Sequence, residues 1–431
     1  MTPEENDKLT RVEGNASMGQ LVRRFWIPFL TSDDLPAPDC DPVRVKLLGE
    51  DLLAFRDTDG RVGLVDPLCA HRCAALFFGR NEEGCIRCIY HGWKYDVTGQ
   101  CVDAPTEPKN SNFALTVRIK AYPVEEKSGV LWTYMGPREL KPPIPSFEFL
   151  AVPEDHLHVS WSTQDCNFVQ AIEGGIDTVH SVYLHSTLDS HRKLDEWKQT
   201  GVRGTPGVQN RYRTKDNPPL LFAENTDYGT VCGGKYAGDG AEEDYWRYNL
   251  YLMPFFTMPP GSPDSKLCHA FVPLDDHTSA RWSFTWKLNG PYSARDKAAL
   301  RLGSGVHSEL VPGTHVPMRR RDNDYLIDRE EQRTLTYTGI HGTGEQDFAV
   351  QEGMGQIVDR SRERLGVTDG GISLMRQRLL KAATDIEEGA EPACANQPAV
   401  FKVHAGEAML PPNTVNWANH ENAQKTLATK W

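Results

Sequence analysis

The residues of this chain with the clearest chemical potential are Asp177, His180 and His185, within the stretch 165–185, DCNFVQAIEGGIDTVHSVYLH. Two imidazoles and a carboxylate suit ferrous iron, and a set of two histidines and one carboxylate leaves coordination positions open for O2. The competing interpretation is a surface or helix-capping feature, because short motifs also arise by chance. The choice between the two depends on the rest of the chain.

The spacing of these residues predicts an irregular local structure. On a regular helix, at about 100° per residue, Asp177 and His180 share a face, whereas His180 and His185 point about 140° apart. Both histidines can therefore bind one metal only if the helix ends or bulges between them. Gly174 and Gly175, just upstream, are consistent with a closely packed, irregular segment.

The composition of the chain excludes several classes of protein. A length of 431 residues predicts at least two domains, and a formal charge of −12 argues against nucleic-acid binding as the main function. No apolar run approaches the roughly 20 residues that span a bilayer, and the N-terminal residues do not resemble a signal peptide. Ten cysteines in so long a chain indicate a reducing compartment, with thiols available to bind metal. We therefore expect a cytoplasmic protein with no membrane partner.

A second motif pairs Cys69-Ala-His71 with Cys88-Ile-Tyr-His91. Each half offers one thiolate and one imidazole from a tight turn between predicted strands, so the two turns can be hairpin tips that meet. Two cysteines and two histidines fit either tetrahedral zinc or a Rieske [2Fe–2S] cluster. A zinc finger usually places its cysteines in one half and its histidines in the other. The mixed halves found here favour the Rieske cluster over zinc.

With both motifs in place, the chain resembles the α-subunit of Rieske non-haem iron ring-hydroxylating oxygenases, and more narrowly the phthalate dioxygenase family. The similarity runs through RVEGNASMGQLVRRFWIP, CAHRCAALFFGRNEEGCIRCIYHGWKYD, CNFVQAIEGGIDTVHSVYLH and EQDFAVQEGMGQIVDRSRERLG. It implies an α+β protein with an N-terminal all-β Rieske domain, followed by a helix-grip catalytic domain whose antiparallel sheet curls around helices. One departure is Cys73, where such proteins often carry glycine.

We expect three segments along the chain. Residues 1–45 form an N-terminal segment that packs on the catalytic domain, residues 46–140 form the Rieske domain, and residues 141–431 form the catalytic domain with a mononuclear iron. The run Lys141-Pro-Pro-Ile-Pro predicts an extended linker at the boundary. Residues 186–243 are polar and rich in glycine, which predicts a long loop or a lid over the pocket.

Aromatic residues close to the second cluster turn are expected to shield the cluster from water, because burial and hydrogen bonding tune its potential. They are Tyr90, Trp93 and Tyr95, with Gly92 between them. Ordinary hydrophobic core is the alternative interpretation for the same residues.

The third ligand of the iron must come from far along the chain, because two histidines alone make an incomplete ferrous site. The candidates are Asp347, Glu352 and Asp359. The resemblance favours Asp347, at the start of a predicted helix. The alternative role for Asp347 is a carboxylate that stabilises the helix N-terminus through the helix dipole.

The resemblance also implies an assembly. The cluster of one subunit would serve the iron of its neighbour in a trimeric ring, either as a trimer or as a hexamer of stacked trimers. Asp177 would bridge the two centres, accepting hydrogen bonds from His180 and, across the subunit interface, from His91 or His71. A separate NADH-dependent reductase with flavin and iron–sulfur cofactors would supply electrons.

The expected substrate is an aromatic carboxylate, phthalate or a relative, which reacts with O2. On the predicted strand 244–257, Arg247 shares a face with aromatic residues and can anchor a carboxylate by a bidentate pair, although a surface salt bridge is the alternative. Arg211 is a candidate for a second anchor, with Arg213 beside it. Three other functions stay open: monooxygenation or O-demethylation on the same scaffold, a Rieske electron carrier with a non-catalytic C-terminal domain, and a zinc-stabilised binding protein.

Overall fold

The computed structural model describes residues 1–108, 111–188, 212–213, 215–238, 242–261, 264–415 and 417–427. The chain separates into two compact units. The smaller unit is Val12–Pro142, and the larger one combines Met1–Arg11 with Pro143–Trp431. The chain passes from one to the other inside the proline-rich run that the sequence analysis took as a linker.

The N-terminal segment does not behave as one piece, which corrects the prediction for residues 1–45. Helix α1 (Pro3–Thr10) belongs to the larger unit, but residues 12–45 belong to the smaller one. The reason is strand pairing, because β1 (Trp26–Thr31) pairs with β11 (Val130–Tyr134) and β2 (Val43–Leu47) pairs with β3 (Glu50–Arg56). These ladders satisfy backbone groups that a packed surface segment would leave to solvent.

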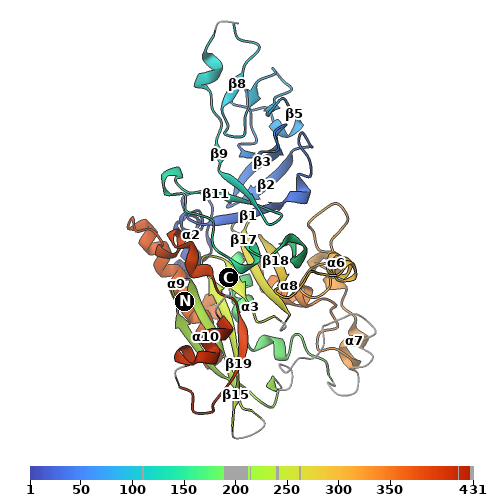
Figure 1. Ribbon diagram of the computed structural model, residues 1–431, viewed down its shortest axis with the longest axis vertical. Helices are drawn as coiled ribbons and strands as arrows, with labels where there is room; N and C mark the ends of the chain where they lie inside the picture. The colour runs from blue at the N-terminus through green and yellow to red at the C-terminus, as the bar shows by residue number, and fades with distance from the viewer. Residues whose placement is uncertain are drawn as a thin grey trace. The chain divides into compact units, whose positions relative to one another are not determined.

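The smaller unit is built from three antiparallel sheets (Figure 1). Apolar side chains from several of its strands form a buried core that includes Phe55, Ile86 and Tyr95. The sheet orders are β1-β11-β10, β2-β3-β4-β9 and β5-β6-β7-β8. The remaining bounds are α2 (Ser17–Val22), β4 (Val62–Val65), β5 (Arg80–Glu82), β6 (Cys85–Arg87), β7 (Lys94–Tyr95), β8 (Cys101–Asp103), β9 (Ala121–Tyr122) and β10 (Val124–Lys127).

The larger unit is built on an eight-stranded antiparallel sheet (Figure 1). The sheet runs β12-β18-β17-β16-β15-β14-β13, and β19 pairs with β15 off this path. The bounds are β12 (Leu157–Gln164), β13 (Leu220–Asn225), β14 (Gly229–Tyr236), β15 (Asp244–Leu252), β16 (Phe256–Met258), β17 (Ser265–Pro273), β18 (Ser279–Lys287) and β19 (Gly406–Leu410). An all-β part followed by an antiparallel sheet with helices confirms the predicted α+β fold.

Helix α3 (Phe168–Ile176) lies against strands β15 to β17 of this sheet. Helices α8 (Thr343–Gly353) and α9 (Gly370–Glu387) pack against α3. Glycine allows α3 to approach the sheet closely at position 175, where a Cβ would come within 2.6 Å of Thr257 Oγ1. The other described helices are α6 (Ala294–Arg301), α7 (Arg329–Thr334) and α10 (Glu421–Leu427). No helix in the described ranges is long and apolar enough to cross a membrane.

The last turn of α3 is fixed by a buried ionic network. Glu173 Oε1 accepts hydrogen bonds from Arg360 Nε at 3.0 Å and from Arg376 Nε at 2.7 Å. All three side chains are at most about one-tenth exposed. Removing one partner from such a network leaves an uncompensated charge, at a cost of several kcal/mol. These ion pairs therefore hold the end of α3 rigidly, directly before Asp177 and the two histidines.

The predicted loop over residues 186–243 is partly wrong, because β13 and β14 lie within it. The glycines of this segment were interpreted as loop residues, but they allow neighbouring strands to pack closely. A Cβ at Gly233 would lie 1.9 Å from the carbonyl oxygen of Arg247 on the neighbouring strand β15. Positions 189–211, 214 and 239–241 lie outside the described residues, and the lid predicted for this segment is not described there.

Candidate functional site

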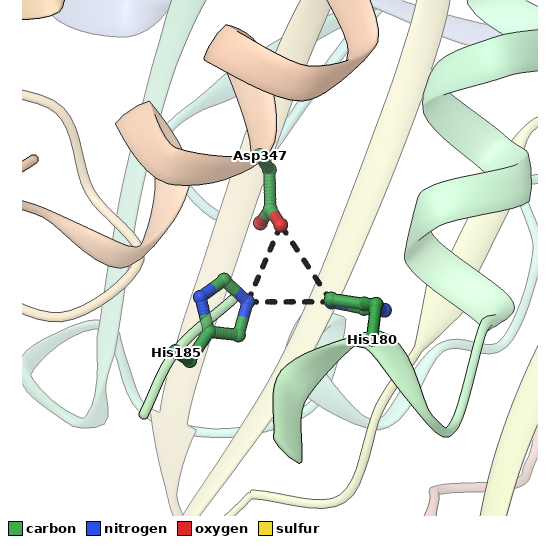
Figure 2. A group of neighbouring side chains, drawn as sticks. All are labelled: His180, His185 and Asp347. Carbon is green, nitrogen blue, oxygen red and sulfur yellow. Dashed lines mark hydrogen bonds and ion pairs between the residues drawn. The ribbon is translucent and has the colours of Figure 1, made fainter. Parts of the chain in front are cut away.

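Three side chains from distant parts of the larger unit converge on one point, as Figure 2 shows. The Nε2 atoms of His180 and His185 are 3.3 Å apart. Asp347 Oδ1 lies 3.6 Å from the first of these nitrogens and 3.3 Å from the second. With metal–ligand bonds of about 2.1 Å, neighbouring ligand atoms of an octahedral ion lie about 3 Å apart. The triangle therefore has the dimensions of one face of a metal site, and the donor set of two imidazoles and one carboxylate fits iron.

The chain places the two histidines by ending α3 early. The helix stops at Ile176, and Asp177 takes an extended backbone conformation. The Oδ1 atom of Asp177 accepts a hydrogen bond from the Val179 backbone N–H at 2.7 Å, which turns the chain into a short 3-10 helix, His180–Val182. The helix thus ends before the histidines, and this lets them face each other despite their spacing.

Of the three candidates for the third ligand, the structure brings only Asp347 to the histidines. Glu352 lies further along α8, where it accepts hydrogen bonds from the Tyr325 hydroxyl and from the Asp165 backbone N–H. Asp359 caps a 3-10 turn, accepting from the Ser361 backbone N–H at 3.1 Å. Both carboxylates serve local structure.

The electrostatics of the triangle keep the Asp347 carboxylate charged and favour a positive charge beside it. Burial acts to raise the pKa of Asp347, but the two histidines and Arg281 outweigh it, so the pKa is lowered. For His180, burial acts to lower the pKa, and the carboxylates of Asp177 and Asp347 outweigh it, so the pKa is raised. The Oδ2 atom of Asp177 lies 3.6 Å from His180 Nδ1. Two carboxylates thus face one imidazole, which suits a bound cation.

The predicted anchor Arg247 is buried on β15, and its Nη1 forms an ion pair with Glu407 Oε1 at 3.0 Å. Arg211 lies outside the described residues. Its neighbour Arg213 donates through Nη2 to the Ser181 hydroxyl, directly after His180. Burial, together with the charge of Arg247, lowers the pKa of Arg213 to about 10. Ser181 was not among the residues predicted from the sequence, and only its adjacency to His180 offered a signal.

The two cysteine–histidine turns of the smaller unit have the same hydrogen-bond pattern. In the first turn, the Cys69 N–H donates to Ala74 O and the Cys73 N–H donates to Cys69 O, each at 2.9 Å. In the second, the Cys88 N–H donates to Trp93 O at 2.8 Å and the Gly92 N–H donates to Cys88 O at 2.9 Å. The two loops are therefore structural repeats of each other.

This repeat shows that Cys73 and Gly92 occupy equivalent positions in the two turns. Cys73 and Gly92 are both the fourth residue after a cysteine, and both have positive φ, 54° and 78°. Glycine adopts that conformation without strain, whereas a residue with a Cβ does not. The second loop carries the expected glycine, and the first carries a strained cysteine.

The four side chains of these turns fit the predicted cluster. The Cys69 and Cys88 side chains are buried, and the rings of His71 and His91 lie edge to face with centroids 4.4 Å apart. The Tyr95 hydroxyl lies 3.2 Å from Cys69 Sγ. His71 Nδ1 is buried and has no hydrogen-bond partner among the described residues, as expected of an atom that binds a metal. Two thiols and two imidazoles are the ligand set of a Rieske [2Fe–2S] cluster.

The aromatic residues around the turns divide into two groups. Trp93 is buried and stacks on His71 with ring centroids 4.5 Å apart, and Tyr95 is fully buried. Tyr90 is 55% exposed, so it does not form part of the covering core. Trp93 thus fixes the plane of one histidine in addition to filling the core.

Family models match nearly the whole chain. Residues 25–123 match the Rieske [2Fe-2S] domain, and residues 133–430 match the LigXa C-terminal domain like family. The oxygenase subunit of phthalate 4,5-dioxygenase from Pseudomonas putida is 34% identical over 98% of this chain and 95% of its own length. This chain belongs to the Rieske non-haem iron ring-hydroxylating oxygenases, in the phthalate dioxygenase family.

Other Rieske oxygenases agree with this assignment. The oxygenase subunit of 3-chlorobenzoate-3,4-dioxygenase from Comamonas testosteroni is 35% identical over 96% of both chains. The oxygenase subunit of 5,5'-dehydrodivanillate O-demethylase from Sphingobium sp. (strain NBRC 103272 / SYK-6) is 30% identical over 93% of this chain and 85% of its own. The crystal structure of dicamba monooxygenase bound to dicamba has the same fold, with a TM-score of 0.59 and 18% identity over 86% of this chain and 99% of that one.

Membership of the Rieske oxygenases settles the class of the protein. It is an oxidoreductase of a family that combines a Rieske [2Fe–2S] cluster with a mononuclear iron and works with a reductase or ferredoxin. The zinc-stabilised binding protein, which the cysteine–histidine motif alone left open, is excluded by this membership.

Proposed function

We propose that this Rieske oxygenase hydroxylates an aromatic carboxylate of the phthalate type with O2, using electrons from an NADH-dependent reductase with flavin and iron–sulfur cofactors. The observation that carries the substrate class is a pair of arginines, the buried Arg247 and the partly buried Arg213, which is hydrogen-bonded to Ser181 beside His180. The named substrates of two similar oxygenases, phthalate and 3-chlorobenzoate, are both aromatic carboxylates.

Two separate sets of residues would hold the iron–sulfur cluster and the mononuclear iron. Cys69, His71, Cys88 and His91 would hold the cluster, and His180, His185 and Asp347 would hold the mononuclear iron. When bound, the cluster carries single electrons and the iron is where O2 is reduced. The chain's own task is to orient these ligands, to place the substrate and to couple the two centres.

Asp177 is the proposed coupling residue. One carboxylate oxygen accepts from the Val179 backbone N–H, and the other faces His180 Nδ1 at 3.6 Å. The side chain is 28% exposed, so it can also accept a hydrogen bond from outside the chain. We propose that a cluster histidine of a neighbouring subunit makes this bond in a trimer or a hexamer of stacked trimers, because a shared carboxylate gives a short path between two metal centres.

The substrate carboxylate would bind at the two arginines. In the described part of the chain, Glu407 is the one carboxylate that pairs with either Arg213 or Arg247. The Nε atoms of both arginines are buried and have no hydrogen-bond partner there. A buried cation is costly unless it is paired. An aromatic acid would offset this cost by charge-assisted bonds to Arg213, which would orient its ring toward the iron ligands.

Product analysis tests the proposal. The protein, loaded with iron and cluster and reduced chemically, would be mixed with isotope-labelled O2 and a panel of benzene mono- and dicarboxylates. Incorporation of both oxygen atoms into a cis-dihydrodiol supports dioxygenation. If no aromatic acid is oxidised while a neutral aromatic compound is, the proposed substrate class is wrong.

The second candidate is monooxygenation or O-demethylation of an aromatic acid, which the similarity to an O-demethylase subunit favours. It predicts one labelled oxygen atom in the products and release of formaldehyde from a methoxy substrate. A third candidate is an electron carrier with a non-catalytic larger unit. The convergence of His180, His185 and Asp347 argues against it, and iron beyond the two atoms of the cluster would exclude it.

A further inference from the structure

The ring of His185 is held at both of its nitrogens by neighbouring residues of one helix. Its Nε2 faces Asp347, and its Nδ1 faces the side chain of Gln346, which immediately precedes Asp347 in α8. We propose that Gln346 is a positioning residue: it fixes the tautomer and the plane of His185, and it thereby sets how tightly the site binds iron. This inference rests on the proposed role of His185 as an iron ligand.

The orientation of the Gln346 amide follows from its other hydrogen bond. Its Nε2 donates to the carbonyl oxygen of Ile340 at 2.8 Å. A backbone carbonyl can only accept, so the amide nitrogen must face Ile340 and the amide oxygen must face His185. The assignment of nitrogen and oxygen in this amide is therefore fixed by chemistry.

The tautomer of His185 follows in turn. Gln346 Oε1 lies 2.7 Å from His185 Nδ1, and an amide oxygen can only accept. Nδ1 must then carry the proton, which leaves the lone pair of Nε2 directed at His180 and Asp347. The His185 side chain is only 6% exposed, so water has little access to replace the glutamine as acceptor. An imidazole with a free Nε2 lone pair is the form that binds a metal.

The helix that carries both residues is itself fixed near its N-terminus. The guanidinium of Arg281 lies over the Phe348 ring at 4.3 Å from its centroid. It also packs on Gly344, where a Cβ would approach Arg281 Nη1 to 2.1 Å. Arg281 donates to the backbone carbonyl of Val306 at 2.7 Å, which anchors the guanidinium in turn. Gln346 and Asp347 thus extend from a rigid turn, and this rigidity keeps the Gln346 side chain in place against His185.

The two histidines are supported differently. His180 Nδ1 faces the carboxylate of Asp177 at 3.6 Å, whereas His185 Nδ1 donates a short bond to a neutral amide. A carboxylate acceptor raises the basicity of an imidazole more than an amide does. The amide therefore orients His185 without adding a third carboxylate to a site that already contains Asp177 and Asp347.

The test measures iron binding by the full chain with its cluster in place. Anaerobic competition between the protein and a chromophoric chelator, with Fe(II) alone as the probe, gives the affinity. Gln346→Leu keeps the size of the side chain but removes the acceptor, and it is expected to weaken iron binding about 10–100-fold. The Mössbauer spectrum of the remaining mononuclear iron should change as well, because the His185 ring is no longer fixed. Gln346→Glu restores an acceptor of the same length and should bind iron more tightly than Gln346→Leu.

The matched control is Gln351→Leu, which removes a buried amide from the same helix. Gln351 bonds to Gln164 and Gln170 and does not contact the triangle. It should lower the melting temperature without changing the iron affinity. If Gln346→Leu does not fold, Gln346→Asn replaces it, since its shorter amide cannot reach His185 and the same loss is expected.

Two negative results are distinguishable. Unchanged iron affinity and an unchanged Mössbauer spectrum in the Gln346 variants would overturn the positioning role. Absence of mononuclear iron from the unmodified protein at saturating Fe(II) would instead overturn the proposed function, because His185 would then not be an iron ligand.

Discussion

The two candidate metal sites are built in opposite ways. The cluster turns lie close together in the sequence, within residues 69–93, and repeat one hydrogen-bond pattern. The iron triangle joins His180 and His185, which both follow the end of α3, to Asp347, more than 160 residues further along the chain. The first site depends on local turn geometry, and the second depends on the packing of α3 against a sheet and of α8 against α3. Damage to one should therefore leave the other intact.

The largest expected effect comes from removing the distant ligand. Asp347→Ala should abolish turnover, by about 10³-fold or more, because several kcal/mol of transition-state stabilisation depend on the iron. Iron analysis should show the loss of the mononuclear iron, while the EPR signal of the reduced cluster stays unchanged. Asp359→Asn is the matched control, because Asp359 is an exposed cap that should not affect iron. Loss of the cluster signal in Asp347→Ala would show that the two sites are not independent.

The coupling between the sites is tested by Asp177→Asn. Asparagine keeps the oxygen that accepts from the Val179 N–H, so the turn that places His180 should survive. The charge that faces His180 is lost, and turnover should fall about 100-fold with both metals still bound. Stopped-flow oxidation of the reduced cluster by O2 in the presence of substrate should slow by the same factor. A normal oxidation rate would remove Asp177 from the electron path.

The different construction of the two sites also explains which of their residues could be predicted from the sequence. All four proposed cluster ligands could be named from the sequence, because mixed Cys/His halves at short spacing have few other uses. The histidines of the triangle could be predicted as a pair, but the place where α3 ends could not. That end depends on an Asx turn at Asp177 and on the buried ion pairs of Glu173. Asp347 was chosen over Glu352 by resemblance, since all three candidates share one polar, helical stretch.

Other features depend on contacts that no local pattern encodes. The pairing of residues 26–31 with 130–134 joins segments about a hundred residues apart, so residues 12–45 were assigned to the wrong unit. Gln346 gave no signal because its role appears only when α8 meets His185. Arg213 was a weaker candidate than Arg247 in the sequence, since no strand pattern surrounds it. Its importance emerges from the bond to Ser181.

A smaller effect is expected from removing the proposed substrate anchor, which lies in the larger unit. Arg213→Met should raise the KM for the preferred aromatic acid about tenfold, because a charge-assisted bond of about 1.5 kcal/mol is lost, while kcat and iron content change little. Arg247→Met is the comparison, since it leaves the partly buried Glu407 without its partner and should lower the melting temperature more than Arg213→Met does. An unchanged KM in both variants would exclude the arginine pair as the anchor.

The smallest expected effect distinguishes the two cluster turns from each other. Cys73→Gly gives the first turn the residue that the second already has at this position, and it relieves a positive φ of 54°. The left-handed conformation costs a residue with a Cβ roughly 1–2 kcal/mol, and the greater flexibility of unfolded glycine offsets about half of this. The melting temperature of the smaller unit should therefore rise by about 1–3 °C.

Two further variants separate the backbone conformation from the thiol. Cys73→Ala removes the sulfur but keeps a Cβ at the same φ, so it should not stabilise the unit. Gly92→Ala imposes the strain on the second turn, where a Cβ would also lie 2.9 Å from Pro105 Cγ, and it should destabilise the unit by more than Cys73→Gly stabilises it. If Cys73→Ala stabilises as much as Cys73→Gly, the strain lies in the thiol and not in the turn, and the equivalence of the two loops would not extend to their energetics.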